Sequence, residues 1–171
     1  DGKLQTRYSP YLTQVEVNCL YMKNGMNDFS FGWTEKDVRL TPRDYLKWNN
    51  QTVQLFEKIL TENETSENPK EFIVATHFCP SRKFITGKFR DSLLNGGFVS
   101  DFEWFIEKHP SIKAWVCGHI HSRVETFYQR EDGSKCILLA NPRGYSGSSE
   151  PIGWSPNVFI ETDNWSVVKF A

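Results

Sequence analysis

The sequence predicts a mixed α/β fold, on the strength of two observations. Short apolar runs at residues 71–76 and 114–117 favour buried strands, and a helical pattern lies between them at residues 100–108. After residue 121 the pattern changes to short alternating runs separated by turn residues, which is typical of an antiparallel meander. A strand–helix–strand unit followed by a meander predicts a mixed sheet or a two-sheet α/β sandwich.

The first third of the chain predicts strand, then a long connection, then a helix. Residues 11–22 alternate well enough to suggest one or two strands, and residues 25–39 form an aromatic-rich connection. Thr41-Pro42-Arg43-Asp44 is a helix start, with an N-cap threonine, a proline at the first position and an acid in the first turn. Apolar residues then recur at intervals of three and four, which predicts a helix ending near Thr61.

The remaining elements follow from local patterns in the same way. Residues 82–97 have no period and several basic and glycine residues, which indicates a loop or lid. Ser100 and Glu103 have capping-box spacing and predict a helix through Lys108. The patterns further predict a hairpin at 124–129 and 135–140, a glycine- and serine-rich loop at 141–156, and a second hairpin at 158–162 and 165–170.

Composition limits the classes of protein to consider. The chain has 171 residues, which predicts a single domain over residues 1–171. Its net charge of −1 offers no basic field for nucleic acid, so nucleic-acid binding is not favoured and stays open. Its four cysteines form no C-x-x-C pair, and the sequence shows no signal peptide or long apolar segment. We therefore expect reduced thiols, no membrane partner and a cytoplasmic location.

Three of the four histidines follow the apolar runs. His77 comes directly after the first run, and Gly118-His119-Ile120-His121 ends the second. Histidines at i and i+2 share no helix face, but a tight turn brings both rings into one volume, and Gly118 permits the backbone angles of such a turn. Because imidazole is the commonest metal ligand, the set predicts a metal centre for phosphate chemistry.

Each of these residues also has a simpler interpretation. His77 alone is more often a hydrogen-bonded core histidine, and His109 lies at a helix end, where a partial charge offsets the dipole. Cys79 and Cys117 are isolated, so core packing is favoured over structural zinc. Arg143 follows the last strand near the site and either clamps a phosphate or lies on a surface turn.

Three ordered blocks resemble the calcineurin-like metallophosphoesterases. Residues 72–81, FIVATHFCPS, resemble the family's VVTHHAPS block, and residues 115–121, WVCGHIH, resemble its GHxH block. Residues 141–145, NPRGY, match the motif that follows in one bacterial and phage branch. The resemblance runs from about Cys19 to Phe170.

The resemblance implies a fold, a cofactor and a reaction. The fold would be the C-terminal part of a four-layer α/β/β/α sandwich with mixed sheets. Two divalent or trivalent metal ions (manganese, iron or zinc) would lie about 3.5–4 Å apart, and a hydroxide bridging them would attack phosphomonoesters or phosphodiesters. His77 and His119 would hold one metal and His121 the other, and Asn141 and Arg143 would line the rim that binds the phosphate-ester substrate.

The family's earlier blocks, D-x-H, G-D-x-x-D and G-N-H-[DE], do not occur in this sequence. We therefore expect the remaining metal ligands from polypeptide not in this chain, either a longer chain or a second chain carrying the N-terminal half of the domain. Two alternatives stay open. One is a non-catalytic structural or interaction module that keeps the fold, and the other is a mononuclear hydrolase using His77, His119 and His121.

Overall fold

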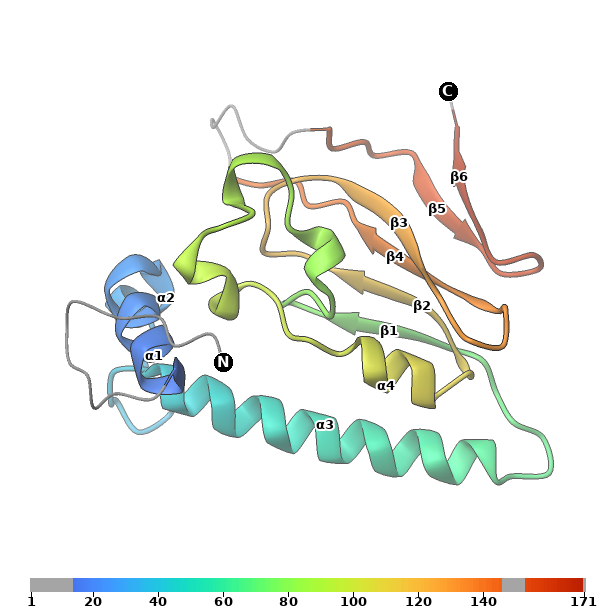
Figure 1. Cartoon of the computed structure of the whole chain (residues 1–171), viewed down its shortest axis with the longest axis horizontal. Helices are drawn as coiled ribbons and strands as arrows, with labels where there is room; N and C mark the ends of the chain where they lie inside the picture. The colour runs from blue at the N-terminus through green and yellow to red at the C-terminus, as the bar shows by residue number, and fades with distance from the viewer. Residues whose placement is uncertain (1–13, 146–152, 171) are drawn as a thin grey trace. The chain divides into compact units, whose positions relative to one another are not determined.

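The computed structural model describes residues 14–145 and 153–170, which form two compact units (Figure 1). Unit 1 takes in the described residues of Asp1–Glu57 and Lys88–Gly97, and unit 2 those of Lys58–Gly87 and Phe98–Ala171. The sequence predicted a single domain over residues 1–171, and this remains a prediction. The predictions for residues 11–13 and 146–152 fall outside the described residues.

The named elements of unit 1 are helices, in residues where the sequence predicted strands (11–22), a connection (25–39), a helix (42–61) and a loop (82–97). Its elements are α1 (Gln14–Gly25), α2 (Asn27–Phe31), the first part of α3 (Pro42–Glu64) and the 3₁₀ helix η3 (Leu93–Gly97). The prediction of strands within residues 11–22 is wrong. The buried residues there are Val17 and Met22 of α1 and Met26 just beyond it, at intervals of five and four residues, whereas a strand with one buried face would bury every second residue. Contact with η3 selects the helix, and Met22 and Met26 pack against Gly97 there.

The long helix α3 begins where the sequence placed it. The Thr41 backbone N–H and hydroxyl both donate to Asp44 Oδ2, at 2.8 and 2.7 Å, and the Asp44 N–H faces the Thr41 hydroxyl at 3.4 Å. These hydrogen bonds occupy donors that a helix start leaves without intrahelical partners. The helix continues to Glu64, three residues beyond the predicted end at Thr61.

Unit 2 contains the mixed sheet that the sequence predicted. Four strands pair in the order β1-β2-β4-β3, with β1, β2 and β4 parallel and β3 antiparallel to β4. The hairpin β5–β6 forms a separate two-stranded sheet. The bounds are β1 (Phe72–Thr76), β2 (Ile112–Cys117), β3 (Val124–Gln129), β4 (Lys135–Ala140), β5 (Val158–Glu161) and β6 (Ser166–Lys169).

The central strands β2 and β4 are covered on both faces, as their apolar character requires. On one face Trp115 packs near Phe105 of α4 (Glu103–Lys108), with ring centroids 6.4 Å apart. On the other face Ala114, Ile137 and Leu139 form a cluster with four side chains of the β5–β6 hairpin, Val158, Ile160, Trp165 and Val167. Unit 2 is therefore layered as helix, sheet and hairpin, and the complete four-layer sandwich stays a prediction.

Helix α4 starts without the capping box that the sequence predicted. Its N-cap residue is Phe102, which makes no side-chain cap hydrogen bond, so the predicted role of Ser100 and Glu103 is wrong. The Glu103 carboxylate instead accepts a 2.5 Å hydrogen bond from the hydroxyl of Ser81, a wholly buried residue far away in sequence. The Ser81 hydroxyl also caps the 3₁₀ helix η1 (Arg82–Phe84) by accepting from the Lys83 N–H. The next turn, η2, spans Gly87–Phe89.

Polar side chains hold the connection from α4 to β2. His109, at the end of α4 as predicted, is buried with its Nδ1 2.9 Å from Glu64 Oε2, and the Ser111 hydroxyl donates to Glu64 Oε1. The buried guanidinium of Arg130 donates to three backbone carbonyl oxygens, those of Ile106, His109 and Ile112. The carboxylate of Glu64 thus joins the end of α3 to the residues before β2, and Arg130 holds the connection from α4 to β2.

In the parts of the chain that are described, no helix combines the length with the apolar character needed to cross a lipid bilayer.

Candidate metal centre at the ends of β1 and β2

Strands β1 and β2 place two of the three predicted histidines in contact. The strands are parallel neighbours, with Thr76 opposite Cys117, so the residues that follow them leave the sheet at the same edge. The Gly118 N–H donates to the His77 carbonyl oxygen at 3.1 Å, which extends this pairing beyond the strands. The ring centroids of His77 and His119 lie 4.8 Å apart, in an edge-to-face arrangement.

A tight turn centred on His119 directs its ring toward His77. The Ile120 N–H donates to the Gly118 carbonyl oxygen at 2.7 Å, and φ of His119 is 64°. A three-residue turn with a positive central φ is rare and strained for a residue with a side chain. The sequence predicted this turn but assigned its unusual angles to Gly118, which is wrong. Left-handed backbone falls on His119 and on His121, whose φ is 45°.

The turn after β1 is held by a short hydrogen-bond chain. The Trp115 indole donates to the Thr76 hydroxyl at 2.8 Å, and this hydroxyl donates to the Phe78 carbonyl oxygen at 2.6 Å. Because Trp115 is a buried residue of β2, the core of the sheet fixes the backbone on either side of His77. The histidine itself is exposed.

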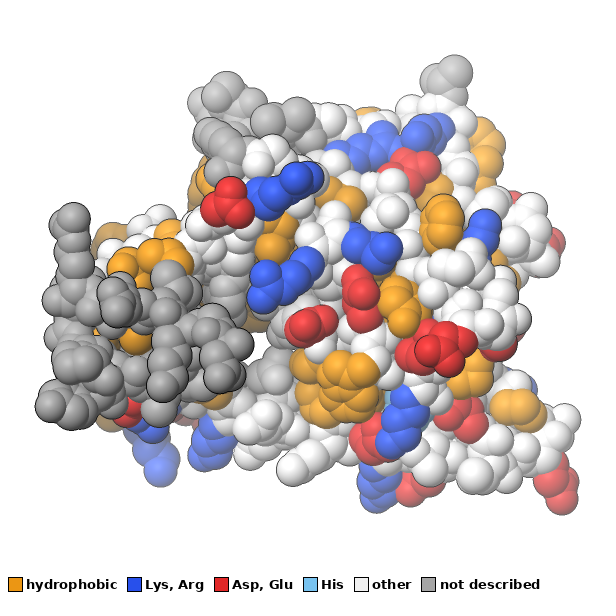
Figure 2. Space-filling view, viewed as in Figure 1, with side chains coloured by type: hydrophobic (Ala, Val, Ile, Leu, Met, Phe, Trp, Pro, Cys, Tyr) orange, Lys and Arg blue, Asp and Glu red, His pale blue; other side chains and the backbone are white. Residues whose placement is uncertain are grey.

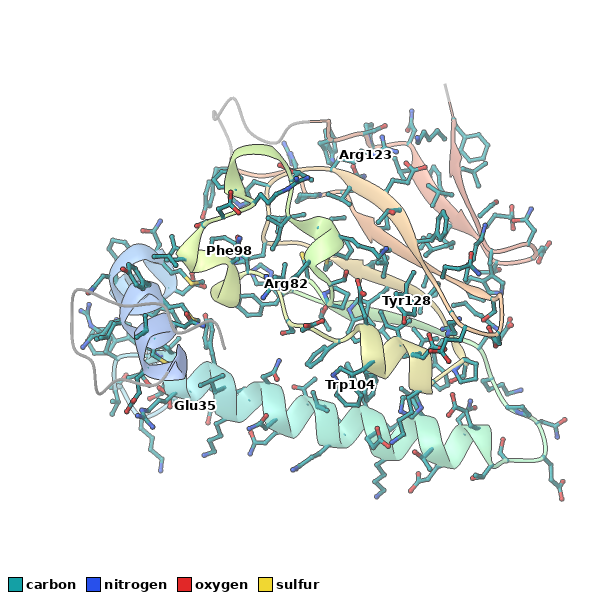
Figure 3. The ribbon with its side chains drawn as sticks, viewed as in Figure 1. Glu35, Arg82, Phe98, Trp104, Arg123 and Tyr128 are labelled. Atoms are coloured by element: carbon teal, nitrogen blue, oxygen red, sulfur yellow. The ribbon has the colours of Figure 1, made fainter. Side chains whose placement is uncertain are left out.

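Two phenylalanine rings, which the sequence analysis did not select, pack against His119. Phe78 lies 4.7 Å and Phe98 4.5 Å from its ring centroid. Phe98, labelled in Figure 3, is held there because the Cys79 N–H donates to its carbonyl oxygen at 3.1 Å and the Ser100 N–H donates to the Cys79 carbonyl oxygen at 2.8 Å. Phe78 is adjacent to His77 in sequence, but the approach of Phe98 depends on pairing between distant segments.

His121 is directed to a different neighbour. Its ring contacts Tyr145 edge to face, with centroids 4.6 Å apart, and Tyr145 is 65% exposed. Tyr145 belongs to the NPRGY motif but was not selected as a site residue. The structure therefore brings His77 and His119 together and places His121 against the loop that begins at Asn141.

The other two predicted residues, Asn141 and Arg143, differ in their surroundings. The Asn141 amide donates to the Ser155 carbonyl oxygen at 2.7 Å and accepts from the Ser155 N–H at 3.1 Å. Asn141 thus closes the base of the loop through paired hydrogen bonds, a structural role that the sequence did not predict. Arg143 is exposed, so its guanidinium is accessible to an anion.

Charged side chains of both signs lie on the surface of the protein. On the face seen in Figure 2, lysine and arginine side chains alternate with aspartate and glutamate side chains. The carboxylate of Glu125 in β3 forms ion pairs with Arg123 at 2.6 Å and with Lys169 of β6 at 2.9 Å. The hydrogen bond from Lys169, together with that from Arg123, holds the pKa of the Glu125 carboxyl below its ordinary value, and outweighs the opposing effect of partial burial.

The described residues bring together two of the three histidines predicted to hold metal. Two imidazoles in contact have the donor chemistry that zinc, iron or manganese takes in proteins. Among the residues described, however, no three histidine, cysteine, aspartate or glutamate side chains are grouped so that they could hold an ion. The metal centre, and the further ligands expected from polypeptide outside this chain, stay predictions.

Comparisons with protein-family models, with curated proteins and with solved structures find no match to this chain.

Proposed function

We propose that this chain takes part in the metal-dependent hydrolysis of phosphomonoesters or phosphodiesters, with the remaining metal ligands supplied by polypeptide outside it. The observation that carries the proposal is the contact between the rings of His77 and His119 where two adjacent parallel strands end. Open α/β sheets bind their ligands at this edge. The strained backbone at His119 supports the same assignment, because such strain is concentrated at functional sites.

The residues have separate roles in this proposal. His77 and His119 would hold one ion and His121 a second, each being manganese, iron or zinc. When bound, such ions polarise phosphoryl oxygens and make a water molecule acidic enough to attack at neutral pH. The rings of Phe78 and Phe98 fix the plane of His119 and exclude water from one side of it.

Arg143 and Asn141 serve the substrate in different ways. The exposed guanidinium of Arg143 attracts and orients the phosphate, while Asn141 holds the base of the loop that carries it. Replacing Arg143 is therefore expected to raise KM with little change in kcat.

Metal titration of the metal-free chain tests the proposal directly. We expect the chain to take up zinc or manganese, and His119→Ala to weaken that uptake by at least about tenfold, measured by calorimetry. His109→Gln is the control, since His109 is buried against Glu64 and its replacement should leave metal uptake unchanged. A chain that binds neither zinc, manganese nor iron even together with polypeptide carrying the missing carboxylates, or a His119→Ala variant that binds them as well as the wild type, would contradict the proposal.

Hydrolysis of p-nitrophenyl phosphate and bis(p-nitrophenyl) phosphate then separates the reaction from binding alone. We expect turnover to require metal and the polypeptide that carries the missing carboxylates, a second chain being one source. Activity of the isolated chain with one metal per molecule would instead favour the mononuclear hydrolase.

One observation favours the second candidate, a non-catalytic module that keeps the fold. The ring of His119 packs against two phenylalanines and His77, and no three-ligand group is assembled among the described residues. A chain that neither binds metal nor supports hydrolysis with its complement would establish this alternative.

A further inference from the structure

Two thiols lie between the segments that carry His77 and His119. Cys79 follows His77 by two residues, and Cys117 precedes His119 by two. Their Sγ atoms are 3.0 Å apart, although the residues are 38 positions apart in the chain. A disulfide bond measures about 2.05 Å, so a movement of about 1 Å would bring the two sulfur atoms to bonding distance.

The backbone holds both cysteines in place on opposite sides of this contact. Cys79 forms a parallel bridge with Val99, and its sulfur lies 3.6 Å from the Gly118 carbonyl oxygen. Cys117 is the last residue of β2 and is paired with Thr76 on one side and Ala140 on the other. The proximity of the two thiols therefore rests on the end of β2 and on the bridge that holds Cys79 beyond the end of β1.

The two cysteines differ in their access to solvent. Cys79 is wholly buried, whereas Cys117 is partly exposed. A reagent in solution consequently meets Cys117 first, and Cys79 is positioned to complete the reaction from inside. Cys136, also wholly buried, lies in β4 and its sulfhydryl donates to the carbonyl oxygen of Ile137 next to it.

We propose that Cys79 and Cys117 are a site of reversible oxidation, at which a small-molecule disulfide such as oxidised glutathione converts the two thiols into an intramolecular disulfide. The sulfur of Cys117 attacks the reagent, breaks its S–S bond, forms a mixed disulfide and releases one small thiol. The sulfur of Cys79 then attacks Cys117 and expels the second small thiol. The two protons of the protein thiols leave on the two released small thiols. The protein loses two electrons, and these electrons reduce the reagent.

The second step is favoured by geometry. Because the attacking sulfur of Cys79 is already in contact with Cys117, the step is intramolecular and has a high effective concentration. The mixed disulfide should therefore not accumulate. The bridge would link the segments that carry the two contacting histidines, and the proposal holds whether or not the chain hydrolyses phosphate esters.

Peptide mapping of the full chain under non-reducing conditions tests this inference. After incubation with oxidised glutathione, we expect the loss of two titratable thiols, a mass lower by two hydrogen atoms and a linked peptide pair containing Cys79 and Cys117. Dithiothreitol should restore both thiols. A glutathione adduct that persists on Cys117, unchanged thiols, or a link through Cys19 or Cys136 would overturn the proposal.

Two serine variants control the assignment. Cys117→Ser should abolish the linked pair, and Cys136→Ser, which removes a wholly buried thiol of β4, should leave it unchanged. Because the peptide map of the wild-type chain alone decides the outcome, the test holds even where a variant fails to fold.

Discussion

His119 and His121 adopt a backbone conformation that residues with a side chain rarely adopt. The left-handed region brings Cβ close to the following carbonyl oxygen and costs about 1–2 kcal/mol for each residue. Two histidines of one turn carry this cost, which the surrounding structure must offset.

The strain can be measured by comparing two variants at His119. We expect His119→Gly to be more stable than His119→Ala by about 1 kcal/mol, because glycine adopts a positive φ without strain. Urea unfolding followed by circular dichroism provides the measurement.

His77 provides the matched control, since it is not among the residues with positive φ. At this position alanine should be at least as stable as glycine, because glycine loses more conformational freedom on folding. The same order at both positions would contradict the assignment of strain to His119.

At the scale of elements, α3 is joined to β2 through the carboxylate of Glu64. Partial burial favours its protonated form, but hydrogen bonds from the Ser111 hydroxyl, the His109 ring and the Ser111 N–H outweigh this and hold the pKa of Glu64 below its ordinary value. A carboxyl whose pKa is lowered by folding stabilises the protein above its unfolded pKa of about 4.3. This stabilisation is lost as the pH falls through the folded pKa.

The Glu64→Gln variant should therefore show a pH-dependent loss of stability. At pH 7 we expect the free energy of unfolding to fall by about 1–2 kcal/mol, the usual value of charge-assisted hydrogen bonds. The difference should shrink as the pH falls from 7 toward 3, because the stabilisation declines below the unfolded pKa of the carboxyl. Urea unfolding at each pH gives the comparison.

Glu62→Gln is the control on the same helix. Its side chain is 66% exposed and lies 4.0 Å from Lys58, so the change should stay within about 0.5 kcal/mol at both pH values. An equal loss at pH 7 and pH 3 for Glu64→Gln would assign the effect to packing instead of charge.

The end of α2 depends on the absence of a side chain at Gly32. A Cβ atom there would collide with the Asp28 carbonyl oxygen and would lie 2.6 Å from Cδ1 of Leu40. We expect Gly32→Ala to destabilise unit 1 by about 1–3 kcal/mol, because a backbone atom cannot give way.

The comparison variant is Gly96→Ala in the same unit. Its Cβ would meet Asn18 at 3.5 Å, an ordinary contact, so stability should change by no more than about 0.5 kcal/mol. Thermal unfolding of both variants decides the point, and equal losses would show that overpacking is not the cause.

At the scale of the whole molecule, the described chain consists of two compact units that share α3. Gly32→Ala perturbs unit 1, and Arg130→Met removes from unit 2 the guanidinium that binds three buried carbonyl oxygens. If each unit opens by itself, hydrogen exchange should increase in α1 and α2 for the first variant and in α4 and β2 for the second. An increase throughout the described chain in both variants would instead indicate one cooperative domain, as the sequence predicts.

Local patterns were sufficient for most elements of unit 2 and for the start of α3. The cap at Thr41, the apolar runs of β1 and β2 and the turn residues of both hairpins act over a few positions, so the sequence alone predicts them. Helix α1 was missed because its apolar residues fit a strand and a helix about equally well, and packing against η3 decides between the two. The start of α4 was missed because the hydroxyl that binds Glu103 comes from Ser81, far away in the chain.

The sequence by itself determined that His77 and His119 each follow a short apolar strand, because apolar runs and turn residues act over a few positions. The structure pairs these strands as parallel neighbours, so that both histidines leave the sheet at the same edge. Only the tertiary structure decided which groups surround these rings. The contacts of His119 with Phe98, of His121 with Tyr145 and of Cys79 with Cys117 join residues that are distant in sequence or lie beyond a turn. Such contacts depend on how separate segments pack together. The periodicity of apolar residues along one segment indicates only which face of that segment is buried.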